Sequence, residues 1–246
     1  MQIYYRIFGW SHFVPNLAFY CDQRVPENAA IDRRLLAVMA ERGLGRRIGY
    51  IPSGPEPSRR YFRDRQVYYG RYGLDLCLFY DLDETHSADD AQALFRCDAI
   101  HLSGGHTGGF LGRLKRSGML PLLKRWADSG GLLIGASAGA IIMTPTIATD
   151  GLFTGHAPES LMTETALDLV PFEFFPHLGT RPTYLPELVR YSRSTTRPIL
   201  ACNDGDGLVV TKSGIECIGR PLWIANGETK TADDMLLSTI PVTVTR

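Results

Sequence analysis

The sequence predicts an α/β protein with a mostly parallel sheet that helices cover on both faces. Short apolar runs at 48–52, 76–80 and 98–102 alternate with stretches in which apolar residues recur at helical spacing. The length of 246 residues and the hydrophobic share of 44% allow a sizeable core. No internal repeat or linker interrupts the chain, so we expect one domain over residues 1–246.

The first half carries the clearest elements. In chain order we expect helices at 29–42, 61–72, 87–95, 110–115 and 119–129, and strands at 48–52, 76–80, 98–102 and 132–136. Ile31, Leu35 and Val38 lie on one face of the first helix. Ser87 and Asp90 have the spacing of an N-terminal capping box. Strands that alternate with helices imply right-handed crossovers and parallel pairing.

The second half is less regular. Residues 150–161 are expected to form a loop, and Pro186 to Ser192 a helix. The remaining apolar runs predict strands at 169–175, 198–202, 207–211 and 215–218. The aromatic-rich stretch 1–28 shows no clear element.

Composition excludes several classes of protein. Acidic and basic residues number 26 each, so nothing indicates a nucleic-acid or membrane-surface partner. We find neither a secretory signal in Met1 to Trp10 nor an apolar run of membrane-spanning length. The five scattered cysteines lack the spacing of a zinc site and indicate reduced, buried thiols. We therefore expect a cytoplasmic protein.

The segment Leu132 to Met143 is the most informative for function. Two apolar runs flank Ser137, and Gly135 and Gly139 complete a G-x-S-x-G pattern. In such an elbow a strand turns sharply into a helix and exposes the serine hydroxyl. The first free N–H groups of the helix can stabilise a developing oxyanion. The alternative is a turn of small residues with an unreactive serine.

A nucleophilic serine requires a base, for which histidine is the usual residue. His177 follows Pro176 at the end of the predicted strand 169–175, at the sheet edge where sites are built. His101 lies inside a strand and is expected in the core, and His12 and His86 are expected at the surface. His156 is the weaker rival.

The third member of a triad must orient the imidazole. Asp150 follows the helix that begins at the serine and is our first choice, although an Asx turn before Gly151 explains it equally well. Glu173, Asp168 and Asp204 are the rivals.

The turn 103–109 is rich in glycine and follows the strand 98–102. It lacks the pattern of a phosphate-binding loop. Glycines here let a backbone N–H point into a site as an oxyanion donor, paired with the N–H of Ala138. A simple strand-to-helix turn is the alternative.

Together these segments resemble peptidase family S51, the dipeptidase E and cyanophycinase group. The resemblance is carried by residues 100–107, by Gly135 to Ala140 with Pro145 to Ile147, by residues 166–172, and by Pro176-His177. It implies a class I glutamine-amidotransferase-like fold, a three-layer αβα sandwich. It further implies that Ser137 is the nucleophile and His177 its base, that the Gly105 and Ala138 amides form the oxyanion hole, and that no metal or cofactor takes part.

The chain departs from the family at the substrate pocket. The family's dipeptidases have Asn where His106 stands, and the arginine that reads a substrate aspartate has no clean counterpart, although Arg181 and Arg190 lie nearby. We therefore expect hydrolysis of small peptides, with Asp-X dipeptides as one candidate class and His106, Arg181 and Arg190 as substrate-binding candidates. We expect a monomer or a homodimer.

Two other functions stay open at this point. An α/β-hydrolase esterase shares the elbow, but its histidine normally follows the last strand, and no histidine lies beyond His177. A non-catalytic, amidotransferase-like binding domain is the other, and the presence of both Ser137 and His177 argues against it.

Overall fold

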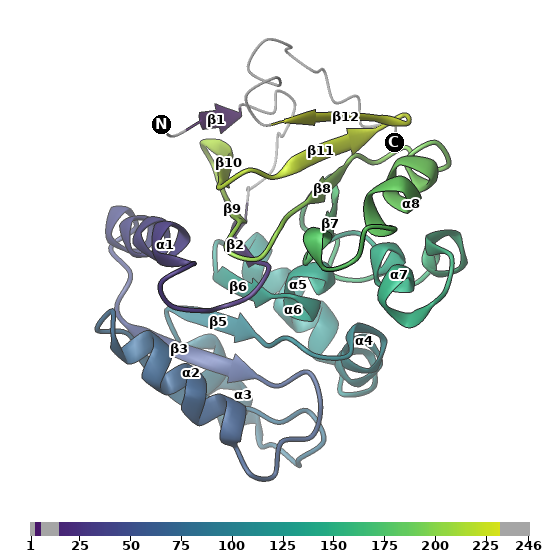
Figure 1. The fold of residues 1–246 in the computed structure, drawn as a ribbon. Helices are drawn as coiled ribbons and strands as arrows, with labels where there is room; N and C mark the ends of the chain where they lie inside the picture. The colour runs from purple at the N-terminus through teal and green to yellow at the C-terminus, as the bar shows by residue number, and fades with distance from the viewer. Residues whose placement is uncertain (1–2, 6–14, 232–246) are drawn as a thin grey trace.

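The structure, a computed structural model, describes residues 3–5 and 15–231. Within them, an eight-stranded sheet has the order β1-β10-β9-β2-β6-β5-β3-β4 (Figure 1). Its strands are β1 (Ile3–Tyr5), β2 (Asn16–Tyr20), β3 (Arg47–Ile51), β4 (Asp75–Phe79), β5 (Ala99–Leu102), β6 (Leu132–Ala136), β9 (Gly207–Thr211) and β10 (Gly214–Ile218). β2, β6, β5, β3 and β4 run parallel, and the other three strands pair antiparallel. The prediction of a mostly parallel α/β sheet is confirmed.

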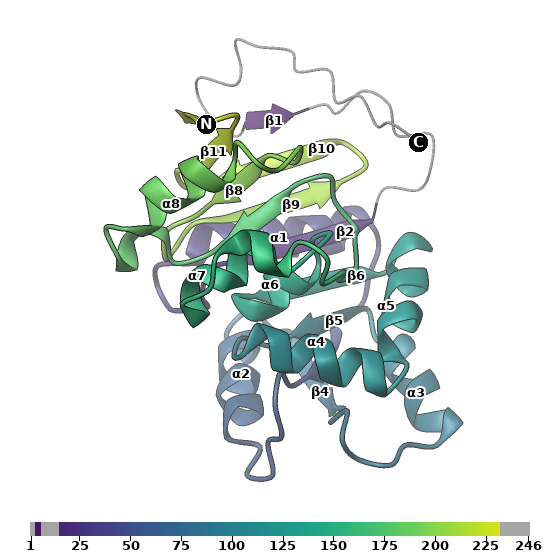
Figure 2. The same cartoon turned by 90° about the vertical axis from the view of Figure 1, so that its right-hand side faces the viewer.

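Helices cover both faces of this sheet. The helices are α1 (Ala29–Glu41), α2 (Arg60–Gly70), α3 (Ala88–Phe95), α4 (Thr107–Arg116), α5 (Met119–Asp128) and α6 (Ala138–Ile142). One buried cluster joins the sheet to α1 and α2, and another joins it to α3, α4, α5 and α6. Figure 2 shows α2 on one side of the strands and α3 and α5 on the other.

Alternation along the strands explains the two cores. In β6, Leu133 belongs to the cluster beneath α4, α5 and α6, whereas Leu132 and Ile134 belong to the cluster beneath α1 and α2. Leu17 and Ala18 of β2 divide in the same way. Because successive side chains of a strand point to opposite faces, an apolar run buries both faces at once.

A second, four-stranded sheet has the order β12-β11-β8-β7 and lies beside α8 (Tyr184–Tyr191) (Figure 1). Its strands are β7 (Glu173–Phe175), β8 (Ile199–Ala201), β11 (Leu222–Ala225) and β12 (Glu228–Thr231). β7 and β8 pair in parallel, with Phe175 opposite Ala201. Their carboxyl ends therefore open at the same edge.

The predicted elements of the first half are present within about three residues of their expected bounds, and the larger differences lie elsewhere. β2 lies at the centre of the large sheet, inside the stretch 1–28 where we predicted no element. The region 150–161, expected as a loop, contains η1 (Ala148–Asp150), α7 (Gly151–Thr154) and η2 (Pro158–Leu161). A fourth short helix, η3 (Leu178–Thr180), follows His177. Residues 6–14, with His12, lie outside the described part.

The predicted strand 169–175 is shortened to Glu173–Phe175. The amides of Leu167, Asp168 and Leu169 donate instead to carbonyls at the end of α6 and just beyond it, and Asp168 has a φ of 51°. Asp168, immediately before the predicted strand, lies in the left-handed region, so the chain does not enter residues 169–172 in an extended conformation. Pro171, inside the predicted strand, has no N–H to donate to a ladder.

The cysteines are free, and Cys21, Cys97 and Cys202 are buried as expected. Cys77 is exposed, so the prediction of buried thiols is wrong for this residue. It lies on β4, at the edge of the sheet, where one flank has no neighbouring strand within the described residues. None of the described helices has the length and apolarity needed to cross a bilayer.

A buried ion pair joins α4 to the loop after β4. The Arg113 guanidinium is hydrogen-bonded to Asp81 and lies 2.9 Å from the Asp83 carboxylate, and it donates to the Pro52 carbonyl at 2.7 Å. Only 4% of Arg113 is exposed. The loops after β3 and β4 are thus tied to the second turn of α4.

We predict that Arg113→Met lowers the free energy of unfolding by about 3–5 kcal/mol, because the Asp81 carboxylate is left buried without its cation. Arg190→Met is the control, since Arg190 pairs with Glu159 and Glu187 at the surface and its loss costs about 0–1 kcal/mol. Urea unfolding of both variants gives the comparison. Equal costs would contradict the assignment of the buried pair as a structural tie.

Candidate active site

Ser137 lies between the last residue of β6 and the first residue of α6. Its φ of 49° and ψ of −109° are unusual for a residue with a side chain. The Ser137 N–H donates to the Tyr20 carbonyl at 2.9 Å, and its carbonyl accepts from the amides of Ala140 and Ile141. These bonds hold a strained conformation that presents a half-buried hydroxyl at the carboxyl edge of the sheet.

The two glycines of the elbow are required by close backbone approach. A Cβ on Gly139 would lie 2.1 Å from the Leu102 carbonyl oxygen, and one on Gly135 would lie 2.6 Å from the Ala140 nitrogen. Both obstacles are backbone atoms that cannot rotate away. The G-x-S-x-G pattern is therefore a packing requirement of the β6–α6 turn.

His177 faces Ser137 from the end of β7. Its Nε2 lies 3.0 Å from the Ser137 Oγ. The residue has a φ of 59° and lies one residue beyond Pro176, so the backbone turns sharply as it leaves the strand. The ring of Phe153 packs edge-on against the imidazole, with 6.2 Å between ring centroids. Phe153 itself stacks on Phe175, which fixes this wall of the site.

The carboxylate beside His177 is that of Asp204, in the loop after β8. It is hydrogen-bonded to the imidazole Nδ1. A carboxylate at Nδ1 fixes the tautomer with hydrogen on that nitrogen, which leaves Nε2 as the acceptor for the Ser137 hydroxyl. The Gly205 N–H donates to the Asp22 carboxylate at 3.0 Å, which anchors the loop that carries Asp204.

Asp150, our first choice for the third position, has a different environment. It is buried in η1, and burial raises the pKa of its carboxyl, against the opposing effects of a hydrogen bond from Thr107 and of the nearby His106 imidazole. Its contacts are thus with the start of α4, whereas the carboxylate in contact with His177 is that of Asp204, which we had ranked as a rival. Asp204 comes to lie beside His177 because the strands that end before these two residues pair in parallel, a register that no local sequence signal gives.

The other two rivals are engaged elsewhere. The Glu173 carboxylate is buried and accepts from the Tyr191 hydroxyl at 2.9 Å. Burial raises its pKa to about 7, despite the lowering effect of the Tyr191 hydrogen bond. The Asp168 carbonyl accepts from Lys124, and its backbone bonds tie it to the end of α6.

The glycine turn after β5 packs against the elbow. A Cβ on Gly104 would lie 3.5 Å from the Ser137 Cβ. Gly105 has a φ of 145°, which a residue with a side chain rarely adopts. Within the described residues, the N–H groups of Gly105 and Ala138 donate to no other protein group. Ala138 is the first residue of α6, whose N–H is free by helix geometry.

His106 caps α4. Its Nδ1 accepts from the Gly109 N–H at 2.8 Å, so its Nε2 carries the proton. The side chain is exposed, and its Nε2–H has no hydrogen-bond acceptor among the residues that the structure describes. Asn is among the residues preferred at a helix N-cap, so the Asn of the family's dipeptidases and the His106 of this chain can both cap a helix at this position.

The remaining candidates differ in their availability. Arg190 is paired with Glu159 and Glu187, whereas Arg181 is exposed and contacts the Tyr184 ring. His101 is a core residue, as predicted: its Nδ1 bonds the Tyr69 hydroxyl, and burial lowers its pKa to about 3. No group of three or more His, Cys, Asp or Glu side chains is placed to hold a metal ion in the part of the chain that the structure describes.

Comparisons with known proteins place the chain in a peptidase family. The profile of peptidase family S51 matches residues 22–218. An uncharacterized peptidase of Listeria innocua serovar 6a is 35% identical over 143 residues, which cover 56% of this chain and 67% of that protein. A peptidase E of Shewanella sp. strain W3-18-1 is 28% identical over 151 residues, 57% of this chain and 62% of that protein. The chain thus spans about two thirds or less of these relatives.

Two solved structures share the fold. A candidate peptidase E from Listeria monocytogenes EGD-e superposes with a TM-score of 0.62 at 23% identity, covering 83% of this chain and 98% of that one. A peptidase from an acI-B1 Actinobacterium gives a TM-score of 0.56 at 15% identity, covering 89% of this chain and 98% of that one.

The raised pKa of Glu173 predicts a pH dependence of stability. Between its ordinary value of 4.5 and its folded value of about 7, the native state holds a proton that the unfolded state releases. The contribution of this group to the free energy of unfolding therefore falls as pH rises through that window, by about 3 kcal/mol at most. In Glu173→Gln this fall is absent, which urea unfolding at pH 4.5 and pH 7.5 measures. An equal change in the free energy of unfolding between these two pH values in both proteins would contradict the assignment of this pH dependence to Glu173.

Proposed function

Because the chain belongs to peptidase family S51, we propose that it hydrolyses small peptides with Ser137 as nucleophile, His177 as general base and Asp204 as the orienting acid. The observation that carries this proposal is the distance of 3.0 Å between the His177 Nε2 and the Ser137 Oγ, at the end of a strained elbow. At that distance the His177 Nε2 can accept the proton of the Ser137 hydroxyl directly.

The first half of the reaction forms an acyl-enzyme. The Ser137 Oγ attacks the carbon of the scissile carbonyl while His177 Nε2 takes the hydroxyl proton. The carbonyl π electrons move to oxygen, and the resulting oxyanion accepts hydrogen bonds from the Gly105 and Ala138 amides. The imidazolium then gives its proton to the leaving nitrogen as the C–N bond breaks, which leaves an ester on Ser137.

Water completes the cycle. His177 removes a proton from a water molecule as the water oxygen attacks the ester carbon. The second tetrahedral intermediate then collapses, and the imidazolium returns that proton to the Ser137 Oγ. Asp204 keeps hydrogen on Nδ1 and stabilises the imidazolium that forms in each half. In place of Asp150, which contacts the start of α4, Asp204 is the acid that we assign to the triad.

For the substrate we propose dipeptides, with the Asp-X class first among those to test. Arg181, four residues after His177, is an exposed cation and the candidate for a substrate carboxylate. Arg190 suits this role less, because two carboxylates already pair its charge. His106 lies in the glycine turn 103–109, and its Nε2–H is the candidate hydrogen-bond donor to the substrate there.

We predict that Ser137→Ala abolishes turnover and leaves the fold intact, because only one oxygen atom is removed. Hydrolysis of Asp-X dipeptides, of other dipeptides and of longer peptides is followed by release of free amino groups, with circular dichroism as the check on folding. Hydrolysis that persists in the folded variant would refute the role of Ser137.

We predict that Asp204→Asn lowers kcat by about 10²–10⁴-fold, since an amide in that position favours the wrong tautomer of the imidazole. Asp150→Asn is the matched control, because the same chemical change is made at a buried carboxylate that contacts α4 and not the base. We expect it to retain kcat within about tenfold of the wild type. The assignment of the acid would be reversed by the opposite ranking of the two variants.

A further inference from the structure

The side chain of Ser53, in the loop after β3, is hydrogen-bonded to the glycine turn 103–109. The Ser53 hydroxyl donates to the Gly104 carbonyl at 2.6 Å. The Ser103 hydroxyl lies 3.2 Å from the same oxygen and also accepts from the Ser53 N–H at 2.7 Å. Ser53 therefore fixes the orientation of the peptide unit that joins Gly104 to Gly105.

The orientation of this peptide unit decides where the Gly105 N–H points. In a trans peptide the C=O and the following N–H point in opposite directions. With the Gly104 carbonyl held toward Ser53, the Gly105 N–H points away from it. The elbow lies close to the same unit, because a Cβ on Gly104 would be 3.4 Å from the Ala136 carbonyl oxygen and 3.5 Å from the Ser137 Cβ.

The Ser53 side chain occupies the space in which a side chain at position 105 would lie. A Cβ at position 105 would lie 2.1 Å from the Ser53 Oγ, and the φ of 145° is in the region that favours glycine. Without the constraint from Ser53, this glycine has the backbone freedom to rotate its amide out of the site.

Ser53 is in turn rigidly held. Its neighbour Pro52 accepts from the buried Arg113 guanidinium at 2.7 Å, and Arg113 is fixed by Asp81 and Asp83. The hydrogen bond between the Ser103 N–H and the Ile51 carbonyl continues the pairing of β3 with β5 up to the turn. A preorganised donor depends on such supporting contacts, since a donor that must reorient during reaction stabilises less charge.

We propose that Ser53 is a positioning residue for the oxyanion hole, which aims the Gly105 N–H at the oxygen of the tetrahedral intermediate. This inference rests on the proposed function. It concerns a residue that makes no hydrogen bond to Ser137 or His177 within the described structure, and that acts through the Gly104–Gly105 peptide unit.

The test compares shape-matched variants. Ser53→Ala and Ser53→Val remove the hydroxyl, whereas Ser53→Thr keeps it in the shape of valine. We expect Ala and Val to lower kcat by about 10–100-fold, less than the 10²–10³-fold loss of a whole oxyanion donor, with KM within about threefold of the wild type. Thr is expected to retain kcat within about threefold. Aspartyl and alanyl p-nitroanilides serve as substrates.

A second readout does not depend on the peptide substrate. A fluorophosphonate–biotin probe forms a bond from phosphorus to the Ser137 Oγ and releases fluoride, while His177 takes the hydroxyl proton. Because the phosphoryl oxygen gains charge in this step, we expect the labelling rate to fall in Ala and Val in parallel with kcat. Ser129→Ala is the control, since Ser129 donates to the Trp126 carbonyl at 2.7 Å in the turn before β6.

The outcomes separate the two proposals. Labelling of the wild type with equal rates in Ser53→Ala overturns the role of Ser53 and leaves the nucleophile in place. A rise in KM at unchanged kcat, or a Thr variant as slow as Val, also overturns it. No labelling and no turnover in the wild type overturns both proposals. If Ser53→Ala fails to fold, the comparison of Thr with Val gives the same decision.

Discussion

The hydrogen bond between the His177 Nε2 and the Ser137 Oγ is the interaction on which the site depends. The two residues come from different sheets, at the ends of β6 and β7, and both have backbone φ values near +50° to +60°. Neither residue reaches the other unless both strands end abruptly at the same edge. Backbone strain at Ser137 and at His177 is therefore part of the arrangement that brings the imidazole to the hydroxyl.

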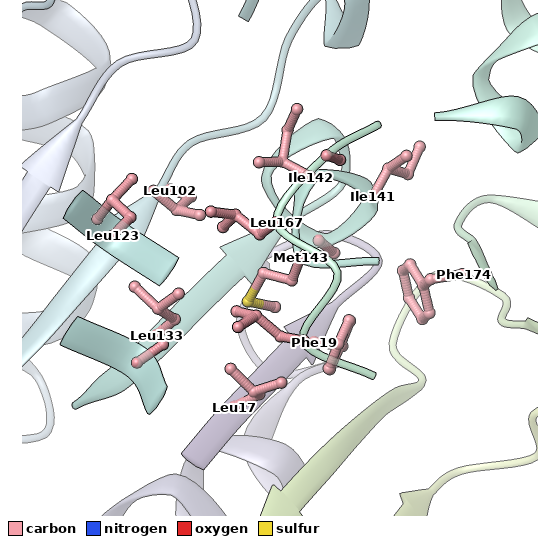
Figure 3. Close-up of a cluster of buried hydrophobic side chains, with 14 of the residues drawn as sticks. Leu17, Phe19, Leu102, Leu123, Leu133, Ile141, Ile142, Met143, Leu167 and Phe174 are labelled. Carbon is pink, nitrogen blue, oxygen red and sulfur yellow. The ribbon is translucent and has the colours of Figure 1, made fainter. Parts of the chain in front are cut away.

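The strained elbow persists because the core behind it cannot yield. The side chain of Met143, at the carboxyl end of α6, packs beside those of the central strand β2, as Figure 3 shows for Met143 and Phe19. The approach of α6 to β5 is so close that only glycine fits at position 139. A close-packed interior transmits this constraint to Ser137, whose hydroxyl has His177 as its hydrogen-bond partner within the described residues.

Local patterns in the sequence predicted the parallel half of the large sheet and the pair Ser137 and His177, because apolar runs, the elbow glycines and a histidine after a strand are all local signals. Asp204 required knowledge that two late strands pair in parallel, a long-range register that composition does not encode. The central position of β2 was missed for the same reason, since its neighbours β6 and β9 are distant in sequence. Asp150 follows α6 in the sequence, yet its carboxylate contacts the start of α4.

Mapping of the fluorophosphonate adduct by mass spectrometry tests the central claim most directly. Our account predicts a single adduct on the peptide that contains Ser137, no adduct in Ser137→Ala, and labelling at least about 100-fold slower in His177→Ala. An adduct on a different residue, or equal labelling with and without the imidazole, would contradict the claim that the bond between these two side chains makes Ser137 a nucleophile.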